Sequence, residues 1–305
     1  MTRFVARLLY LLASALARLP WSWLLRLGDA VAAAWRWRDG RESRVTRINL
    51  ALAYPELLPA QREQWHRAIL RTTGRQILET LRLWTRPHQE NLALLRETHG
   101  TELFDAAIAA GRGVIVAAPH YGNWELLNQW LAARTPLAIL YRPPESKIGE
   151  AFLNLVRADA PDRVTQIRAE GPAVRQLWKL LNAGGVTGIL PDQQPKAGDG
   201  EFAPFFGVPA LTMTLLSRLA GRTGATVLFA YCERIDSHDG APGFALHIEP
   251  APADIGDEDL AVATAALNAS VERIARRDPA QYQWTYKRYT LRPPGSGEEN
   301  PYWNR

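Results

Sequence analysis

Four short apolar runs constrain the fold of this chain most. Each run is bounded by Gly or Pro, and together they cover residues 113–118, 136–141, 185–190 and 226–231. Stretches with helical spacing of apolar residues alternate with them, near residues 124–133, 147–158, 171–183 and 211–221. Apolar strands separated by helices are typical of a largely parallel sheet with helices on both faces. The sequence therefore predicts an α/β domain with its chemistry at the carboxyl ends of the strands.

The rest of the chain is predicted to be mainly helical and to belong to one large domain. Residues 48–110 carry apolar side chains at helical spacing, most clearly along 60–85. We expect the domain to extend over residues 48–292, after an N-terminal helical segment of residues 1–47 and before a short tail of residues 293–305. A chain of 305 residues can bury such a core without disulfides or a structural metal.

Cysteine usage points to a reducing compartment. Cys232 is the only cysteine, so the chain can form no internal disulfide. This excludes a disulfide-stapled secreted scaffold and a Cys-rich zinc module. Cys232 directly follows an apolar run, and we expect its side chain to be buried in the core.

The net charge of +5 is concentrated at the N-terminus. Residues 1–47 hold nine arginines and three acids, a surplus of six, whereas the other 258 residues hold 27 basic and 28 acidic side chains. A nucleic-acid enzyme would carry its basic residues over a folded face, so no nucleic-acid partner is expected. Four of the eleven tryptophans share the segment with the arginines. This combination is typical of a membrane interface, where indole rings lie at headgroup depth and guanidinium groups meet anionic lipid.

The N-terminal segment is predicted to lie on the membrane or to enter it as a short tilted anchor. Its longest uncharged stretch, residues 8–17, is too short to span a bilayer, and a longer span would bury Arg18. On a helix, Arg3, Arg7 and Arg18 fall within about 60° of one another, and Pro20 opens a second helix. The alternatives are a cleaved signal peptide, whose apolar region an arginine would interrupt, and a solvent-facing helical pair.

The segment after the first strand carries the strongest chemical signal. Pro119 ends the strand, Gly122 permits a sharp turn and Asn123 is a good N-cap for the next helix. His120 then lies in the loop and Glu125 in the first helical turn. A carboxylate there can hydrogen-bond one imidazole nitrogen while the other takes a proton from a hydroxyl, and the helix N-terminus offers N–H donors to an anionic oxygen. The alternative is a packed histidine beside a glutamate that satisfies the helix dipole.

At these residues the sequence resembles the lipid A biosynthesis acyltransferases, which include the lauroyl and myristoyl transferases of lipopolysaccharide assembly. His120-Tyr-Gly-Asn-Trp-Glu125 matches the HX4E motif of that family. Similar segments follow the family order: Asn49-Leu-Ala-Leu-Ala-Tyr-Pro55, Tyr141-Arg142-Pro143, Pro191-Asp192-Gln193, Phe205-Phe206-Gly207-Val208-Pro209-Ala210 and Gln281-Tyr-Gln-Trp284. The resemblance extends over about residues 49–292. One departure is Tyr286, which stands where many members carry His.

The resemblance implies a glycerolipid-acyltransferase-like fold, with a mixed, largely parallel sheet flanked by helices and preceded by a membrane anchor. It implies transfer of a fatty acyl group from acyl carrier protein, or less readily coenzyme A, to a hydroxyl of a membrane glycolipid such as a lipid A precursor. The reaction would take place at the cytoplasmic face of the bacterial inner membrane, without an acyl-enzyme. His120 would be the base and Glu125 its orienting partner.

Further residues are expected to bind substrate. Arg142 and Arg157 follow the second apolar run, where an arginine fork suits the phosphates of the acceptor or of phosphopantetheine, and solvated surface arginines are the alternative. Asp192, with Gln193 beside it, is expected to hold an arginine or a lipid hydroxyl, or to cap its own turn. Asn123 is also expected to bind substrate. The loop of residues 205–207 would line an acyl channel or fill the core.

No cofactor and no metal are expected. The remaining histidines are scattered without ligand spacing, and the chain has neither a Gly-Lys-Ser/Thr loop nor a G-x-S-x-G elbow. Two alternatives to the lipid A reaction stay open. One is acylation of a lysophospholipid, an ornithine lipid or a mannosylated lipid, and the other is a non-catalytic lipid-binding or scaffold protein. An intact His120 and Glu125 argue against the scaffold.

Overall fold

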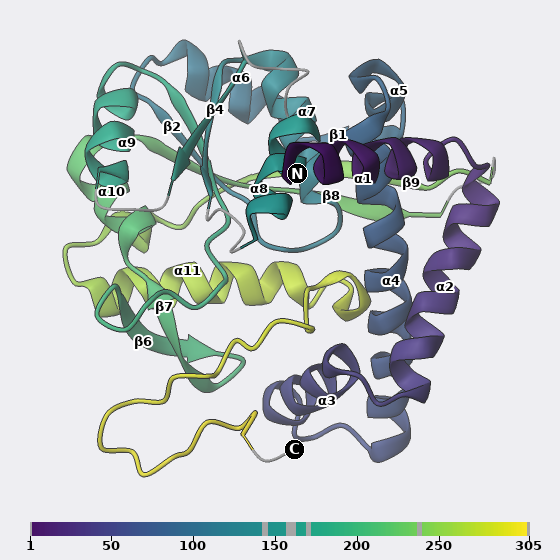
Figure 1. Ribbon diagram of the computed structural model, residues 1–305. Helices are drawn as coiled ribbons and strands as arrows, with labels where there is room; N and C mark the ends of the chain where they lie inside the picture. The colour runs from purple at the N-terminus through teal and green to yellow at the C-terminus, as the bar shows by residue number, and fades with distance from the viewer. Residues whose placement is uncertain (1, 142–145, 157–162, 169–171, 237–239, 304–305) are drawn as a thin grey trace.

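The computed structural model describes residues 2–141, 146–156, 163–168, 172–236 and 240–303, and its main sheet has seven strands (Figure 1). In spatial order the strands are β1 (Leu95–His99), β9 (Gly243–Pro250), β8 (Thr226–Ile235), β2 (Val114–Ala117), β5 (Val186–Ile189), β3 (Leu137–Tyr141) and β4 (Val164–Arg168). Neighbouring strands are parallel except β8 and β9. The predicted mixed, largely parallel α/β sheet is confirmed.

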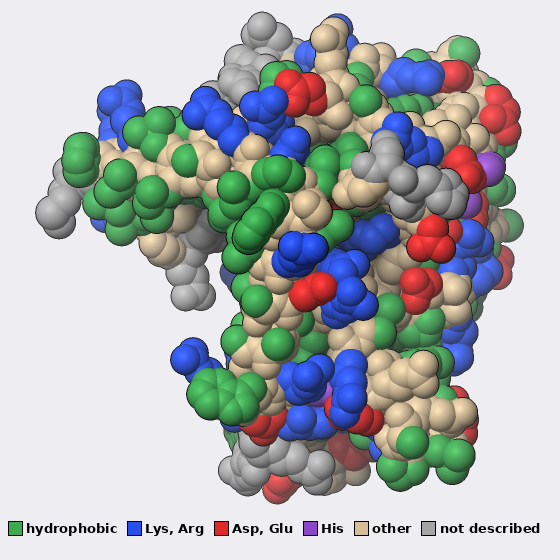
Figure 2. All heavy atoms as spheres, turned by 90° about the vertical axis from the view of Figure 1, so that its right-hand side faces the viewer, with side chains coloured by type: hydrophobic (Ala, Val, Ile, Leu, Met, Phe, Trp, Pro, Cys, Tyr) green, Lys and Arg blue, Asp and Glu red, His purple; other side chains and the backbone are tan. Residues whose placement is uncertain are grey.

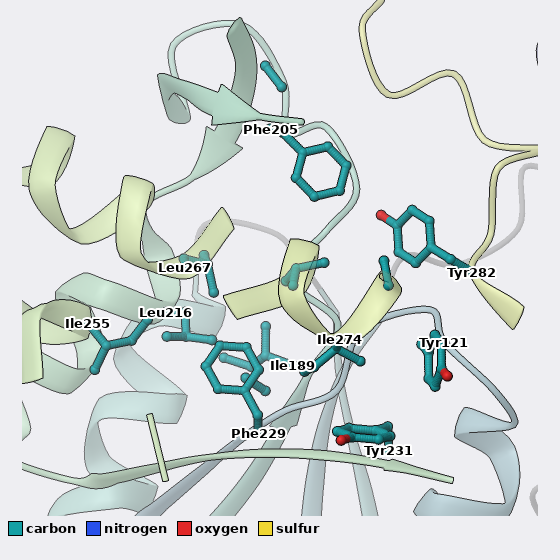
Figure 3. Close-up of a cluster of buried hydrophobic side chains, with 14 of the residues drawn as sticks. Tyr121, Ile189, Phe205, Leu216, Phe229, Tyr231, Ile255, Leu267, Ile274 and Tyr282 are labelled. Carbon is teal, nitrogen blue, oxygen red and sulfur yellow. The ribbon is translucent and has the colours of Figure 1, made fainter. Parts of the chain in front are cut away.

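Both faces of the sheet are buried, as the four apolar runs predict. Val114 and Val116 of β2 join one hydrophobic cluster, whereas Ile115 and Ala117 join the other. The first cluster lies under α6 (Thr101–Ala109) and α7 (Trp124–Arg134), and the second lies under α9 (Ala173–Asn182), α10 (Leu215–Thr223) and α11 (Leu260–Ala275). Figure 3 shows the second cluster, in which Phe229 of the sheet points toward the helices.

The edges of the sheet were not predicted from the sequence. Residues 95–99 lie in a stretch that was expected to be helical, but they form strand β1, and the expected helix over 211–221 begins only at Leu215. Before it, β6 (Gly200–Phe205) and β7 (Val208–Met213) form an antiparallel hairpin. β1 is an edge strand with four exposed residues, so it has no apolar run that could reveal it.

The N-terminal helices are packed on the rest of the chain. α2 (Trp21–Trp37) lies along α4 (Pro59–Thr85), and their backbones approach so closely that a Cβ on Gly74 would lie 2.3 Å from the oxygen of Gly28 (Figure 1). Asp29 of α2 forms ion pairs with Arg71 and Arg75 of α4. The expected boundary at residue 47 falls inside α3 (Arg41–Ala53), and α5 (His88–Leu92) follows α4.

Helix α1 (Thr2–Leu16) presents its large apolar side chains to solvent. Its small residues Ala6 and Ala13 are buried, whereas Phe4 is 72% and Leu11 63% exposed. Figure 2 shows hydrophobic side chains gathered on a projection at the level of α1. The helix contacts α4 and α8 (Lys147–Val156). The helix ends before Arg18, so the expected arginine stripe does not form on one helix.

No single helix in the described part of the chain is long and apolar enough to cross a membrane. Taken together, α1 and α2 are long and apolar enough to cross a membrane, but the two helices are bent by 117° relative to each other.

The C-terminal segment is part of the fold and not a separate tail. After α11 and the short 3-10 helix η2 (Pro279–Gln281), the chain passes the β6–β7 hairpin and returns to α3 (Figure 1). There the buried Tyr302 hydroxyl donates to Asn49 Oδ1. The Asn49 amide donates to the carbonyl oxygens of Trp284 at 2.7 Å and Tyr286 at 2.8 Å.

Candidate active site

His120 and Asp192 meet at the carboxyl ends of two neighbouring parallel strands. Ala117 of β2 is in register with Ile189 of β5, and each site residue lies three positions beyond its strand. Nδ1 of His120 lies 2.8 Å from Oδ1 of Asp192, and the backbone N–H of His120 donates to Oδ2 at 2.9 Å. Both side chains are buried. One carboxylate therefore fixes the ring and the backbone of the same histidine.

This pairing corrects the role expected for Glu125. Glu125 was expected to orient the imidazole, but Asp192 occupies Nδ1 and the ring of Trp124 packs edge-on against His120 at 4.8 Å. Glu125 is half-buried in the first turn of α7, and within the described residues no hydrogen bond joins its carboxylate to His120. Asp192 was expected to hold an arginine or a lipid hydroxyl, and its partner in the structure is His120. Because both residues follow neighbouring buried strands at equal distance, the strand pairing is the signal for this contact.

The charge of Asp192 sets the tautomer of the histidine. Burial opposes ionisation of this carboxyl, but the charge and the ring and backbone N–H groups of His120 outweigh it and hold the pKa of Asp192 below its usual value. Burial, with the negative charge of Asp192, raises the pKa of the neighbouring Tyr282 well above its usual value, so that this phenol stays neutral. In the neutral form of His120, the hydrogen bond to Asp192 selects the tautomer that carries its proton on Nδ1, and Nε2 then holds the lone pair.

Gln193 lies at that second nitrogen. Its amide nitrogen is 3.2 Å from His120 Nε2 and 3.3 Å from Oε1 of Gln283. The backbone N–H of Gln283 also donates to the carbonyl oxygen of His120 at 3.0 Å. Gln283 was not named as a site residue from the sequence, although it lies inside the segment 281–284 that resembles the closing family motif.

The loop after β2 is held from three directions. Gly122 donates to the carbonyl oxygen of Gln281 at 3.0 Å and accepts from the Gln76 side chain of α4 at 2.9 Å. Asn123 N–H donates to the carbonyl oxygen of Cys232 in β8. A Cβ at position 122 would lie 1.9 Å from that Cys232 oxygen, and φ is +60°, so this turn requires glycine. Cys232 itself is fully buried, as expected, and burial raises the pKa of its thiol.

The side chain of Asn123 is used inside the fold, where it holds the loop. Its Oδ1 accepts from Leu126 N–H at 3.1 Å, which confirms the predicted helix cap. Its Nδ2 lies 3.4 Å from Glu79 Oε2, and the side chain is fully buried. The expected substrate contact is therefore corrected to a structural one. Glu79, 1% exposed, forms an ion pair with Arg234 of β8.

Of the other predicted site residues, the two arginines cannot be placed and the two phenylalanines are in the core. Arg142 and Arg157 lie outside the described residues. Phe205 and Phe206 are buried, and Phe206 packs against Tyr54 and Trp284 with ring centroids 5.1 Å apart in each pair. These two aromatic side chains fill the core. Within the described residues no group of three or more His, Cys, Asp or Glu side chains is placed to hold a metal ion.

The HX4E loop lies at the carboxyl ends of the parallel strands, its histidine is paired with a buried carboxylate, and the family match makes the chain an acyltransferase. The chain belongs to the bacterial lipid A biosynthesis acyltransferase family, because the sequence model of that family matches residues 1–290.

Two named relatives cover most of this chain. It is 27% identical over 282 residues to the lipid A biosynthesis palmitoleoyltransferase of Escherichia coli K12, which covers 91% of this chain and 88% of the relative. It is 23% identical over 278 residues to the lipid A biosynthesis lauroyltransferase of the same strain, with 91% and 89% covered. A phosphatidylinositol mannoside acyltransferase of Mycobacterium tuberculosis is 29% identical over 203 residues, with 66% and 62% covered. These names support acyl transfer to a glycolipid.

Proposed function

We propose that this enzyme transfers a fatty acyl chain from an acyl thioester, with acyl carrier protein as the preferred donor, to a hydroxyl of a lipid A precursor. The observation that carries the proposal is the buried His120–Asp192 pair, because it leaves one imidazole nitrogen as a proton acceptor. The names of the relatives that cover most of the chain support lipid A as the acceptor.

In this mechanism Nε2 of His120 removes the proton of the acceptor hydroxyl. Asp192 keeps the Nδ1 proton directed toward itself and stabilises the imidazolium that forms. The hydroxyl oxygen attacks the thioester carbon, and the resulting tetrahedral intermediate expels the thiolate. His120 returns the proton to the sulfur. The products are an ester and a free thiol, and the chain itself forms no covalent intermediate.

The exposed apolar side chains of α1 support a location at the membrane surface. Leu8, Leu9, Leu11 and Leu12 are each more than 40% exposed, and Arg3 and Arg7 are exposed on the same helix. An in-plane helix that immerses such side chains in the headgroup region would bring the site close to a membrane lipid. We place the enzyme at the cytoplasmic face of the bacterial inner membrane, where acyl carrier protein would meet it.

The test is a lipid acylation assay with the full-length protein. Purified enzyme is incubated with acyl-carrier-protein thioesters and a lipid A precursor in mixed micelles, and the lipid is followed by mass spectrometry. We expect one added acyl chain with wild type, and a loss of about 10³-fold or more in His120→Ala. His99→Ala, which changes an exposed histidine, is the matched control. Equal activity in His120→Ala and wild type would refute the role of His120.

A mannosylated phospholipid is the second candidate acceptor. The similarity to a phosphatidylinositol mannoside acyltransferase, at 29% identity over two thirds of the chain, favours it over other lipids. Parallel assays with the two acceptors at equal concentration separate the candidates through kcat/KM. Absence of acylation with either lipid and with coenzyme A thioesters would instead favour a lipid-binding protein.

A further inference from the structure

The side chain of Gln193 lies at Nε2 of His120, the nitrogen that acts as the base in the proposed mechanism. The side chains of Asp192 and Gln193 lie against the same imidazole, one at each ring nitrogen. His120 and Asp192 are buried, whereas Gln193 is half-buried. An acceptor hydroxyl cannot reach Nε2 while the amide of Gln193 stays in hydrogen-bonding contact with it.

The polarity of this contact follows from the amide. The amide nitrogen of Gln193 can only donate, so Nε2 of His120 accepts from it, and the Nδ1 proton of the neutral imidazole is directed at Asp192. An amide nitrogen carries two hydrogens, and the second is directed at Oε1 of Gln283. A continuous series of donors and acceptors therefore joins Asp192, His120, Gln193 and Gln283.

We propose that the amide of Gln193 donates a hydrogen bond to the Nε2 lone pair of His120 in the resting enzyme. During the reaction the same amide donates to the carbonyl oxygen of the thioester. The acceptor hydroxyl takes the place of the amide at Nε2, which frees one N–H of Gln193. The bond to Gln283 keeps the amide beside the reacting atoms. This inference rests on the proposed role of His120 as general base, and it makes Gln193 a catalytic residue.

The step balances without any further reactant. The hydroxyl proton passes to His120 Nε2 as the oxygen forms a bond to the thioester carbon. The electron pair of the C=O bond moves to the carbonyl oxygen, where the freed N–H of Gln193 stabilises the negative charge. The pair then returns, the C–S bond breaks, and the sulfur takes the proton from His120.

Two substitutions at position 193 separate donation from shape. Gln193→Met keeps the length of the side chain and removes both donors, and we expect kcat to fall about 10²-fold. Gln193→Glu keeps the shape but places a carboxylate where a donor is needed, and we expect a larger fall than in Gln193→Met. A residue with only a structural role would give the opposite order, because Glu preserves its shape.

Gln283 and Gln194 supply the partner and the control. Gln283→Met removes the acceptor that retains the amide, so kcat should fall about 10-fold, and adding it to Gln193→Met should cost little more. Gln194→Met changes the next residue, whose Oε1 accepts from Leu291 N–H at 2.8 Å, and should leave kcat close to wild type. Thermal unfolding and the KM for the acceptor are measured for every variant.

The outcomes distinguish this inference from the proposed function. Activity in His120→Ala would refute the base itself. Loss of activity in His120→Ala with wild-type kcat in both Gln193 variants would overturn the role of Gln193 alone, as would a smaller effect of Glu than of Met. If the Gln193 variants do not fold, Gln283→Met decides, because a wild-type kcat in that variant contradicts the proposal.

Discussion

The loop at residues 120–123 and helix α1 differ in which groups they bury: the loop buries polar groups, whereas α1 exposes large apolar side chains. In the loop, His120, Gly122 and Asn123 are buried, and their backbone N–H groups donate to three separate parts of the chain, at Asp192, Gln281 and Cys232. In α1, large leucines are exposed and only small alanines are buried. The loop is therefore built for fixed geometry, and α1 is built to offer surface. Substitutions should accordingly cost activity or folding in the first region and surface binding in the second.

The largest effect is expected from the carboxylate that fixes the histidine. Asp192→Asn keeps the size of the side chain but removes the charge that holds the Nδ1 proton, and we expect kcat to fall about 10³-fold. Glu125→Gln should cost less, because within the described residues no hydrogen bond joins Glu125 to the imidazole. Steady-state rates for the two variants check the order, and a greater loss in Glu125→Gln would restore Glu125 as the orienting residue.

The next effect is on folding, at the ion pair behind the loop. Arg234→Met leaves Glu79 buried and without its cation, which should lower the free energy of unfolding by about 3 kcal/mol. Denaturant titration measures it. The double variant Glu79→Gln/Arg234→Met should recover much of that loss, because it removes the uncompensated charge. A double variant as unstable as the single one would contradict this account.

A smaller loss is expected on acidification, through Glu233. Burial opposes its charge, but hydrogen bonds from His247, Arg277 and Tyr121 prevail and lower its pKa to about 2. The unfolded value is about 4.3, so this stabilisation is complete above about pH 5 and is lost as pH falls toward 2. Between these pH values, the free energy of unfolding should decline more steeply with falling pH in wild type than in Glu233→Gln. Equal slopes would assign the acid sensitivity to other carboxylates.

The smallest effect on folding is expected in α1. Leu11→Ser and Leu12→Ser change side chains that are about 60% exposed, so the free energy of unfolding should stay within about 0.5 kcal/mol of wild type. Binding to anionic vesicles, measured by sedimentation, should fall about 10-fold or more if these side chains enter lipid. Ala6→Leu, on the buried face of the same helix, should instead destabilise the fold by about 1–3 kcal/mol. Unchanged vesicle binding in the serine variants would remove the membrane role of this face.

The sequence predicts the centre of the sheet better than its edges, for a physical reason. β2 and β5 are buried on both faces and read as apolar runs, whereas β1 reads Leu-Arg-Glu-Thr-His and depends on its neighbour for its conformation. The candidate site follows the same rule. The position of His120 and the cap at Asn123 follow from local sequence. The contact with Asp192, 72 residues away, depends on which strands pair.

The return of the C-terminal segment has a consequence for the timing of biosynthesis. Gln281 and Gln283, which hold Gly122 and Gln193, lie near the end of the chain, and Tyr302 locks that segment onto Asn49. The N-terminal helices leave the ribosome long before those residues are made. The catalytic loop therefore gains its final hydrogen bonds only after residues 281–302 have been made, and we expect acyl transfer to begin after that point of synthesis.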